Sequence, residues 1–406
     1  MKLRIVICIA NFFGVLSRLA KRGSGVMVTG RVILKLQPNA VSLLSRRRKV
    51  ILVSGTNGKT TTTSLIFTAL SVKNKVVSNY TGANLFAGLA AALSQNLSAP
   101  MAVLEVDEMV LPWAIRQSEP EMVVLLNLGR DQLDRLSEVR FVAQKWKDAL
   151  ATLPKRCLIL ADADDPFVVW AARDWSNVLW FSAGGHGHID ASTCPACGAV
   201  LLWSPDGANY SCRCGFARPD AHWMLGGDEL SGPNHQSVKV ISGIPGQAAL
   251  ANAARAIVAA SYFDVDPQDS AMAISSVKSV DGRFSKVRIG RTDFRLMLSK
   301  NPASWRETLT TSALGPKQVL LVVNANTQDG KDTSWLWDVD FTPLKERYVV
   351  VTGQRRLDVS ARLTVNEIPH HLVQDENAAA TLLGEGEADL IASYTAFHRL
   401  AKLVAK

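Results

Sequence analysis

Short apolar runs alternate along the first half of the chain with longer segments in which apolar residues recur every three or four positions. Such runs predict strands and such segments predict helices. Strands that alternate with helices are typical of a mostly parallel sheet covered by helices on both faces. The predicted strands are 50–54, 75–80, 101–108, 121–129 and 158–160, and the clearest helices are 84–95, 138–151 and 247–262.

A second α/β block follows, in which the predicted strands are 318–326, 347–353, 370–375 and 388–394. Between the two blocks, residues 186–222 are rich in His, Gly, Cys, Ser and Pro, which indicates a small insertion. We therefore expect an N-terminal helical segment, a P-loop α/β domain with an inserted ribbon, and a C-terminal Rossmann-like α/β domain. The predicted bounds are 1–46, 47–290 with the ribbon at 190–220, and 291–406.

The N-terminus is apolar from Ile5 to Leu16, with Asn11 inside the run and Arg18, Lys21 and Arg22 after it. The run is too short to span a bilayer, and no small-residue cleavage site follows it. It predicts a helix with an apolar face packed on the protein, with contact to the inner membrane surface as the alternative. We expect a cytoplasmic protein, and the alternative is a peripheral position at the inner face of the membrane.

Charge and cysteine content narrow the class of protein only a little. The 406 residues carry a net charge of +9, which favours an anionic partner such as a nucleotide, nucleic acid or acidic lipid. Four of the six cysteines lie together, so the chain is not a secreted disulfide scaffold. This usage indicates a reducing compartment and one metal site.

The segment GTNGKTTT, residues 55–62, follows a predicted strand and opens a predicted helix. Glycines allow a backbone to wrap closely around phosphate oxygens, and amides at a helix N-terminus bind the anion. A lysine can offset phosphate charge and a threonine hydroxyl can ligate Mg²⁺. The alternative is a glycine turn before an ordinary helix. The pattern favours nucleotide binding by Gly55, Thr56, Asn57, Gly58, Lys59, Thr60 and Thr61, with Thr60 on Mg²⁺.

Magnesium needs a second oxygen ligand, and three acids stand at the end of the strand AVLEVDE, residues 102–108. Parallel sheets place ligands at the carboxyl ends of their strands. We select Glu105 as the magnesium ligand and expect Asp107 and Glu108 to be solvated charges.

The insertion contains Cys194, Cys197, Cys212 and Cys214, spaced as C-x2-C, fourteen residues, then C-x-C. Two cysteine knuckles can supply four thiolates in the closed tetrahedron of a structural Zn²⁺ site. Two disulfides or a redox pair are the alternatives, and a reducing compartment and the lack of a helix start disfavour them.

An acidic loop lies in the last quarter of the chain. It contains Asp329, Asp332, Asp338 and Asp340 together with Trp335 and Trp337. Carboxylates at this density hold a metal, relay protons, or cap and turn a loop. The tryptophans are expected to be core or interface anchors.

The sequence resembles the Mur ligases, which join amino acids onto peptidoglycan precursors. The resemblance rests on GTNGKTTT, LEVDE and NLGRDQLDR (127–135), and then on ALANAARA (249–256) and DGRF (281–284). It implies ATP as the nucleotide, Asn252 at the adenine and Arg283 at the phosphates. Ala249 stands where many Mur ligases have a second asparagine. The ribbon, NPASW (301–305) and DGKDTSWLWDVDF (329–341) make the chain similar to the MurT family in particular.

That resemblance implies ATP-dependent amidation of the D-glutamate α-carboxyl in the lipid II stem peptide, which gives D-isoglutamine. Ammonia must come from glutamine, and hydrolysis needs a cysteine nucleophile. No cysteine follows Cys214, and the ribbon cysteines are committed to metal, so a separate subunit is expected. The resemblance implies a GatD-like glutaminase, whose Cys-His pair Asp332 would complete as a triad acid. Asp329, Asp338 and Asp340 are then expected to be turn or cap residues.

Two other functions stay open at this stage. An ordinary Mur-type amino-acid ligase is expected to carry a precursor-binding domain of about a hundred residues, a usual domain size, whereas about 46 residues precede the loop strand. A zinc-ribbon nucleic-acid-binding ATPase agrees with the basic charge. The ribbon, however, offers only Arg213 and Arg218, so we expect no nucleic-acid partner.

Overall fold

The computed structural model describes residues 3–20, 24–79, 82–130, 139–185, 187–188, 190–279 and 284–403. The chain divides into two compact units. The first contains Met1–Leu128, Glu138–Gly243 and Ala249–Val277, and the second contains Gly129–Ser137, Ile244–Ala248 and Lys278–Lys406.

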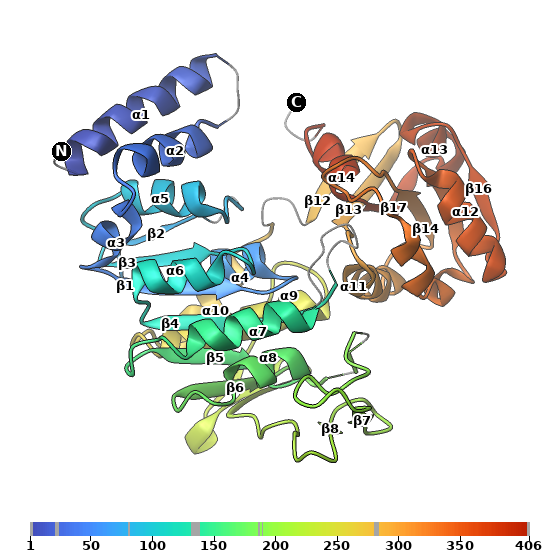
Figure 1. The fold of residues 1–406 in the computed structure, drawn as a ribbon. Coiled ribbons are helices and arrows are strands. Elements are labelled where there is room, and N and C mark those ends of the chain that lie inside the picture. The colour runs from blue at the N-terminus through green and yellow to red at the C-terminus, as the bar shows by residue number, and fades with distance from the viewer. Residues whose placement is uncertain are drawn as a thin grey trace. The chain divides into compact units, whose positions relative to one another are not determined.

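Three helices open the first unit: α1 (Leu3–Leu19), α2 (Val26–Leu36) and α3 (Ala40–Ser45). Helix α1 packs on α2, and α2 packs on α5 (Phe86–Ser94), so that α1 is the outermost of three stacked helices (Figure 1). Glycine permits this close approach, because a Cβ on Gly30 would lie 1.8 Å from the carbonyl oxygen of Ala87. The predicted N-terminal helix is thus present, and its inner face is packed on the protein.

A nine-stranded sheet forms the centre of the first unit, in the order β11-β10-β9-β6-β5-β4-β1-β3-β2. The seven strands β9, β6, β5, β4, β1, β3 and β2 run parallel, and β10 is antiparallel to both of its neighbours, β9 and β11. Their bounds are β1 Lys49–Ser54, β2 Val76–Ser78, β3 Met101–Glu105, β4 Met122–Leu125, β5 Leu158–Asp162, β6 Val178–Ser182, β9 Trp223–Gly226, β10 Glu229–Ser231 and β11 Ser237–Lys239.

Helices cover both faces of this sheet, as the sequence predicts. Successive side chains of β1 point to opposite faces of the sheet. Val50 and Leu52 pack in the core on one face, and Ile51 and Val53 pack in the core on the other. This explains why β1 is apolar throughout, since a strand buried on both faces shows no polar alternation. One face carries α5, α6 (Leu111–Ser118), α7 (Val139–Leu150) and α8 (Pro166–Ala172), and the other carries α4 (Lys59–Leu70), α9 (Gln247–Ser261) and α10 (Pro267–Ser275).

The insertion is a ribbon with a two-stranded sheet, β7 (Leu202–Trp203) and β8 (Tyr210–Ser211). It packs against the sheet face that carries α8: Tyr210 and Phe216 belong to the same core as Phe167. The hydroxyl of Tyr210 donates a 3.0 Å hydrogen bond to the carbonyl of Ala163, which follows β5. The ribbon is therefore fixed to the first unit beside the carboxyl end of β5.

The second unit has a six-stranded sheet in the order β12-β13-β17-β14-β15-β16, parallel except for the β12–β13 hairpin. Helices α13 and α14 cover one face, and α11 and α12 the other. The elements are β12 Phe284–Ile289, β13 Thr292–Leu298, α11 Pro302–Ala313, β14 Gln318–Val322, β15 Tyr348–Thr352, α12 Arg356–Val365, β16 His370–Leu372, α13 Glu376–Leu383, β17 Gly386–Ala392 and α14 Tyr394–Ala401. Two short 3-10 turns of this unit are η2 Ser334–Asp338 and η3 Thr342–Leu344, and η1 Pro233–His235 belongs to the first unit.

The motif NPASW forms the start of α11. The buried Asn301 is the N-cap, and its side chain accepts a 2.9 Å hydrogen bond from the Ser304 amide. The Ser304 hydroxyl returns the contact by accepting from the Asn301 amide at 3.0 Å. Pro302 takes the first helical position, where a missing N–H costs nothing. The motif thus has a local structural role in fixing the direction of α11.

Two parts of the fold differ from the sequence prediction. The first sheet is not wholly parallel, because β9–β11 extend it as an antiparallel meander. The long C-terminal segment of the second unit starts at Lys278 rather than at 291, and it includes β12, which pairs with β13. Both hairpins contain short strands with exposed polar residues, which carry little hydrophobic signal.

Candidate active site

The loop between β1 and α4 has the geometry of a phosphate cradle. Gly58 is the N-cap of α4 and has a φ of 84°, a left-handed conformation that glycine adopts without strain. A Cβ there would also lie 3.0 Å from the side-chain oxygen of Asn252. Lys59, Thr60 and Thr61 form the first helical turn, and the amides of a first helical turn are the groups that bind anions. The loop residues named from the sequence therefore lie together at a helix N-terminus.

Asn127, at the end of β4, holds the loop in shape. Its carbonyl accepts a hydrogen bond from the Thr56 amide at 2.8 Å, and its side-chain oxygen accepts one from the Asn57 amide at 2.9 Å. Its side-chain nitrogen donates to the Asn57 carbonyl at 3.1 Å. Thr56 and Asn57 thus use their amides to fix the loop. The sequence drew attention to NLGRDQLDR but gave Asn127 no role.

Lys59 is nearly buried at the mouth of the loop. Its ammonium group donates to the carbonyl of Gly55 and forms an ion pair with Glu108 at 3.1 Å. The expectation that Glu108 is a solvated charge is wrong, because the short segment after β3 turns its carboxylate back to Lys59. A nucleotide phosphate that reached this site would compete with Glu108 for the lysine.

Glu105 ends β3 and is 2% exposed. Strand pairing places it opposite Val53, directly before the loop. One carboxylate oxygen accepts a 3.1 Å hydrogen bond from Asn84, and the other has no hydrogen-bond partner among the described residues. A buried carboxylate oxygen without a partner is costly, and Mg²⁺ prefers such oxygen ligands. The donor set therefore fits a magnesium ion held by Glu105 and Thr60.

We predict that Glu105→Gln weakens magnesium-dependent ATP turnover. The amide keeps the shape but removes the charge that a divalent cation needs, so the half-saturating Mg²⁺ concentration should rise by about 10–100-fold. A magnesium titration of ATP hydrolysis measures this. Glu119→Gln, on the exposed turn after α6, is the matched control and should leave the titration unchanged. Equal Mg²⁺ dependence in Glu105→Gln and the wild type would contradict the assignment.

Asn252 lies on α9 with its side chain against Gly58. Its side-chain oxygen faces Arg255, one helical turn further on, at 3.5 Å. Arg255 forms a buried ion pair with Asp162 at the end of β5 and stacks on Phe181 at 4.5 Å. Burial raises the pKa of the Asp162 carboxyl to about 7, and the Arg255 guanidinium opposes that rise. The sequence did not identify this pair, which fixes Arg255 beside Asn252.

Arg283, predicted to face the phosphates, and Asp131–Arg135 of the NLGRDQLDR motif lie outside the described residues. Ala249, which stands where many Mur ligases have a second asparagine, is buried on α9.

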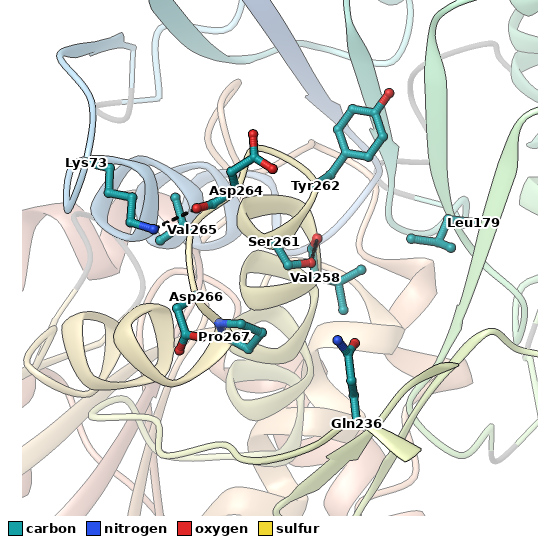
Figure 2. Close-up of a pocket in the computed structure, with 10 residues that line it drawn as sticks. All are labelled: Lys73, Leu179, Gln236, Val258, Ser261, Tyr262, Asp264, Val265, Asp266 and Pro267. Carbon is teal, nitrogen blue, oxygen red and sulfur yellow. Dashed lines mark hydrogen bonds between the residues drawn. The ribbon is translucent and has the colours of Figure 1, made fainter. Parts of the chain in front are cut away.

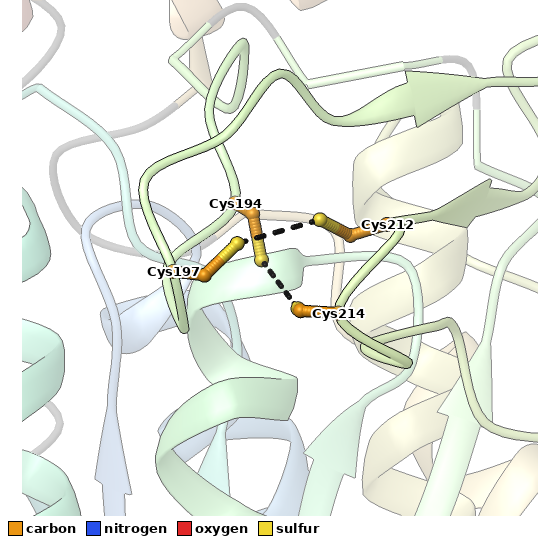
Figure 3. A group of neighbouring side chains, drawn as sticks. All are labelled: Cys194, Cys197, Cys212 and Cys214. Atoms are coloured by element: carbon orange, nitrogen blue, oxygen red, sulfur yellow. Dashed lines mark hydrogen bonds between the residues drawn. The ribbon is translucent and has the colours of Figure 1, made fainter.

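The four ribbon cysteines converge, as Figure 3 shows, and their sulfur atoms all lie within 4.8 Å of one another. The Sγ–Sγ distances are 3.7 Å for Cys194–Cys214 and 3.6 Å for Cys197–Cys212, so none of the four is in a disulfide. Gly198 and Gly215, after each knuckle, have φ values of 77° and 85° that close the turns. The cluster could hold one metal ion through four sulfur ligands.

The ribbon also contacts the carboxyl end of β5. Arg218 donates through two nitrogens, at 2.9 and 3.0 Å, to one carboxylate oxygen of Asp164. His188 faces Asp165 at 3.1 Å, and Asp165 caps α8 and accepts from the Leu128 amide at 2.7 Å. Arg218, one of the two ribbon arginines, therefore binds a carboxylate within the first unit.

The acidic loop of the second unit contains carboxylates in different roles. Asp329 is buried and accepts from the Thr395 amide and hydroxyl at 2.7 and 2.6 Å, which joins the loop to α14. Asp340 accepts from the Thr342 amide at 2.9 Å, in the turn that leads into η3. Asp338 forms an ion pair with Arg130, which belongs to the same unit, at 3.0 Å. These contacts are structural, and for Asp338 the contact is an ion pair rather than a cap.

Asp332 is exposed at the start of η2. Its side chain accepts a 2.8 Å hydrogen bond from the Ser334 amide, and this bond lowers the pKa of its carboxyl. The carboxylate is thus ionised at neutral pH. Trp335 is buried and packs on Trp305, whereas Trp337 is 60% exposed with its ring beside Arg362. Trp335 is a core anchor, and Trp337 lies at the surface of this loop.

A pocket of about 510 Å³ lies at the C-terminal ends of α4 and α9, opposite the ends near the phosphate loop (Figure 2). Its lining includes Tyr262 and Lys73, whose ammonium donates to the Asp264 carbonyl at 2.7 Å. It contains neither loop residues nor Glu105, so it is not the candidate nucleotide site.

The comparisons with known proteins agree with this geometry. The family described as Mur ligase middle domain matches residues 53–260, and MurT ligase C-terminal matches residues 298–397. Two solved structures share the fold. A pseudomurein peptide ligase type C from Methanothermus fervidus has a TM-score of 0.67 at 19% identity over 89% of this chain and 80% of its own. A MurF ligase from Thermotoga maritima in complex with ADP has a TM-score of 0.65 at 18% identity over 94% and 83%.

The fold and the loop define a P-loop protein of the Mur ligase class. Relatives similar over nearly their whole length are subunits named MurT of lipid II isoglutaminyl synthase (glutamine-hydrolyzing). The one from Streptococcus pneumoniae is 30% identical over 96% of this chain and 94% of its own, and the one from Staphylococcus aureus strain N315 is 28% identical over 94% of each. The chain belongs to the MurT branch of the Mur ligase family.

Proposed function

We propose that this chain is the synthetase subunit of an ATP-dependent amidating ligase. It converts the α-carboxyl of D-glutamate in the lipid II stem peptide into the amide, giving D-isoglutamine. One observation supports this most strongly: a phosphate loop with a buried acid beside it occurs in a chain similar over nearly its whole length to MurT subunits.

The proposed first step activates the substrate carboxylate. A carboxylate oxygen attacks the γ-phosphorus of ATP, the bond to the β-γ bridging oxygen breaks, and ADP leaves. Lys59 and the amides of Thr60 and Thr61 stabilise the charge on the phosphoryl oxygens. Mg²⁺ held by Glu105 and Thr60 would neutralise further phosphate charge. Asn252, fixed beside Gly58, would contact the adenine and Arg283 the phosphates.

In the second step ammonia attacks the acyl phosphate. The carbonyl carbon forms the C–N bond, phosphate leaves with the C–O electrons, and the nitrogen loses a proton. Free ammonia is scarce at neutral pH, and the ribbon cysteines converge on one centre. We therefore propose a GatD-like glutaminase as the partner, with Asp332 as the acid that orients the partner's catalytic histidine.

Location follows from the substrate. We propose a cytoplasmic enzyme that meets lipid II at the inner membrane face. Among the described residues, no helix has the length and apolar character needed to cross a bilayer.

The test of this function is reconstitution. The chain and a GatD-like glutaminase, given lipid II, ATP, Mg²⁺ and glutamine, should produce lipid II whose mass falls by the difference between OH and NH₂. Without the glutaminase, ammonium chloride should support the same mass change and glutamine should not. Addition of an amino acid in place of the amide would instead favour an ordinary Mur-type ligase.

We further propose that the ribbon holds one structural Zn²⁺ through Cys194, Cys197, Cys212 and Cys214. The four sulfurs lie close enough to share one ion, and thiolates are the preferred ligands of structural zinc. The cluster is closed by protein ligands, so the ion would stabilise the ribbon.

We predict one zinc per purified chain, measured by elemental analysis. Cys212→Ser should remove that zinc and lower the melting temperature, because metal-binding free energy is folding free energy for such a ribbon. Cys8→Ser, which changes the exposed cysteine of α1, is the matched control and should retain one zinc. Zinc in equal amount in Cys212→Ser would refute the assignment.

A further inference from the structure

Helix α1 is apolar on both of its faces. Its buried residues Val6, Ile7, Ala10 and Gly14 face the protein. On the opposite side, Ile5, Phe12 and Leu19 follow one another at intervals of seven and are 50%, 62% and 75% exposed. Helices that are apolar all round are normally buried. The outward stripe of α1 is thus exposed among the residues that the structure describes, and its members are Ile5, Cys8, Phe12, Val15, Leu16 and Leu19.

The protein holds α1 in this orientation. A Cβ on Gly14 would lie 2.1 Å from the Thr29 hydroxyl, which shows how closely α1 and α2 approach. A Cβ on Gly30 would clash with α5 in the same way. With its inner face fixed on α2, the helix cannot turn the stripe inward without losing this packing.

The charges around the stripe have one sign. Residues 1–104 contain 14 of the 45 Lys and Arg residues and none of the 36 Asp and Glu residues. The remaining 302 residues therefore carry 31 cations and 36 acids, so the positive net charge of the chain comes from its first quarter. On the stacked helices, Arg4, Arg18, Arg31 and Lys35 are exposed. A charge asymmetry of this size indicates an anionic partner for the N-terminal part.

We propose that the outward stripe of α1 docks on an anionic phospholipid bilayer, with the helix lying along its surface. Aromatic and aliphatic side chains would enter the boundary between headgroups and acyl chains while arginine and lysine contact the headgroup phosphates, the two interactions that hold interfacial helices. A second copy of the chain is a poorer occupant. Pairing two stripes would bring Arg4 and Arg18 of both copies together, and residues 1–104 contain no acid to balance them.

Vesicle flotation with the full chain tests this surface. Wild type should float with vesicles of equal parts phosphatidylglycerol and phosphatidylcholine. Binding should fall about tenfold or more with pure phosphatidylcholine or in high salt, because headgroup attraction is screened. Phe12→Gln with Leu19→Gln should reduce binding to the anionic vesicles by about tenfold or more, because two exposed apolar side chains no longer enter the bilayer.

The control carries the same change in exposed apolar residues elsewhere in the first unit: Leu97→Gln with Met272→Gln should bind vesicles as wild type does. Melting temperatures should be equal, which shows that each variant is folded. Wild type that stays unbound, or a stripe variant that binds normally, would overturn the proposal. Self-association abolished by the stripe variant, without vesicle binding, would identify a second copy as the occupant.

The vesicle result does not depend on the proposed reaction. Where that reaction holds, the stripe variant should amidate a water-soluble stem-peptide substrate at the wild-type rate and lose rate only with lipid II in vesicles. If the wild type amidates neither the soluble substrate nor lipid II in vesicles, the proposed function is contradicted. The proposed membrane surface would then still be tested by flotation.

Discussion

Lys59→Met is expected to lower the rate of ATP-dependent amidation by about 10²–10³-fold, the usual effect of removing a charge-stabilising group from a transition state. The ammonium group lies at the mouth of the phosphate loop, where it donates to the carbonyls of Gly55 and Thr56 and to the carboxylate of Glu108. Methionine keeps most of the length of the side chain and removes its charge. Single-turnover formation of ADP from ATP in the presence of lipid II and ammonium chloride measures the loss without the glutaminase.

Lys73→Met is the matched control for this experiment. Lys73 follows the other end of the same helix, is exposed, and donates to a backbone carbonyl. Its replacement should leave the rate unchanged. The double variant Lys59→Met with Glu108→Gln removes the carboxylate that Lys59→Met leaves without its cation. This double variant should be as stable as the wild type, and its rate of ATP-dependent amidation should be as low as that of Lys59→Met. Wild-type turnover by either Lys59 variant would be incompatible with the phosphate site.

Asp332→Asn is expected to lower glutamine hydrolysis by the reconstituted pair by about 10²–10⁴-fold, the range typical of losing the acid of a catalytic triad. The carboxylate is exposed, ionised and oriented by the Ser334 amide. Asparagine can accept the same hydrogen bond but cannot stabilise an imidazolium. Release of glutamate from glutamine, measured with the partner in excess, reports this step.

Asp340→Asn provides a close control. Asp340 also accepts a hydrogen bond from an amide two residues on, at 2.9 Å, and is exposed in the same loop. It should keep full glutaminase activity. The complex of the Asp332→Asn chain with the glutaminase should still amidate lipid II at the wild-type rate when ammonium chloride replaces glutamine, because the ATP site is in the first unit. Glutamine hydrolysis at the wild-type rate in Asp332→Asn would remove Asp332 from the mechanism.

Asp332 and Trp337 are two exposed side chains of the acidic loop, and they differ in size and charge. Asp332 is small, charged and set on a turn, whereas Trp337 presents a large ring that is 60% exposed beside Arg362. Exposed tryptophan beside arginine is typical of protein interfaces. A glutaminase docked on this loop would cover both, which is consistent with an acid supplied between subunits.

The sequence determined the local features whose signal is contained in neighbouring residues. Strand β1, the glycine loop and α4 follow from an apolar run, two glycines and a helix start, and the four cysteines follow from their spacing. The two α/β blocks follow from the alternation of strands and helices. Each of these depends on backbone geometry and burial over a few residues, so the pattern alone is sufficient.

Only the tertiary structure decided which distant side chains meet. Glu108 reaches Lys59 across 49 residues, Asn127 fixes a loop 70 residues before it, and Asp162 meets Arg255 across 93 residues. The tertiary structure also revealed that one buried carboxylate oxygen of Glu105 has no hydrogen-bond partner in the part of the chain that the structure describes, and that the second face of α1 is exposed there. An ion pair, a desolvated oxygen and an exposed stripe depend on what surrounds a residue in space. Sequence spacing carries no information about those surroundings until the sheets are assembled.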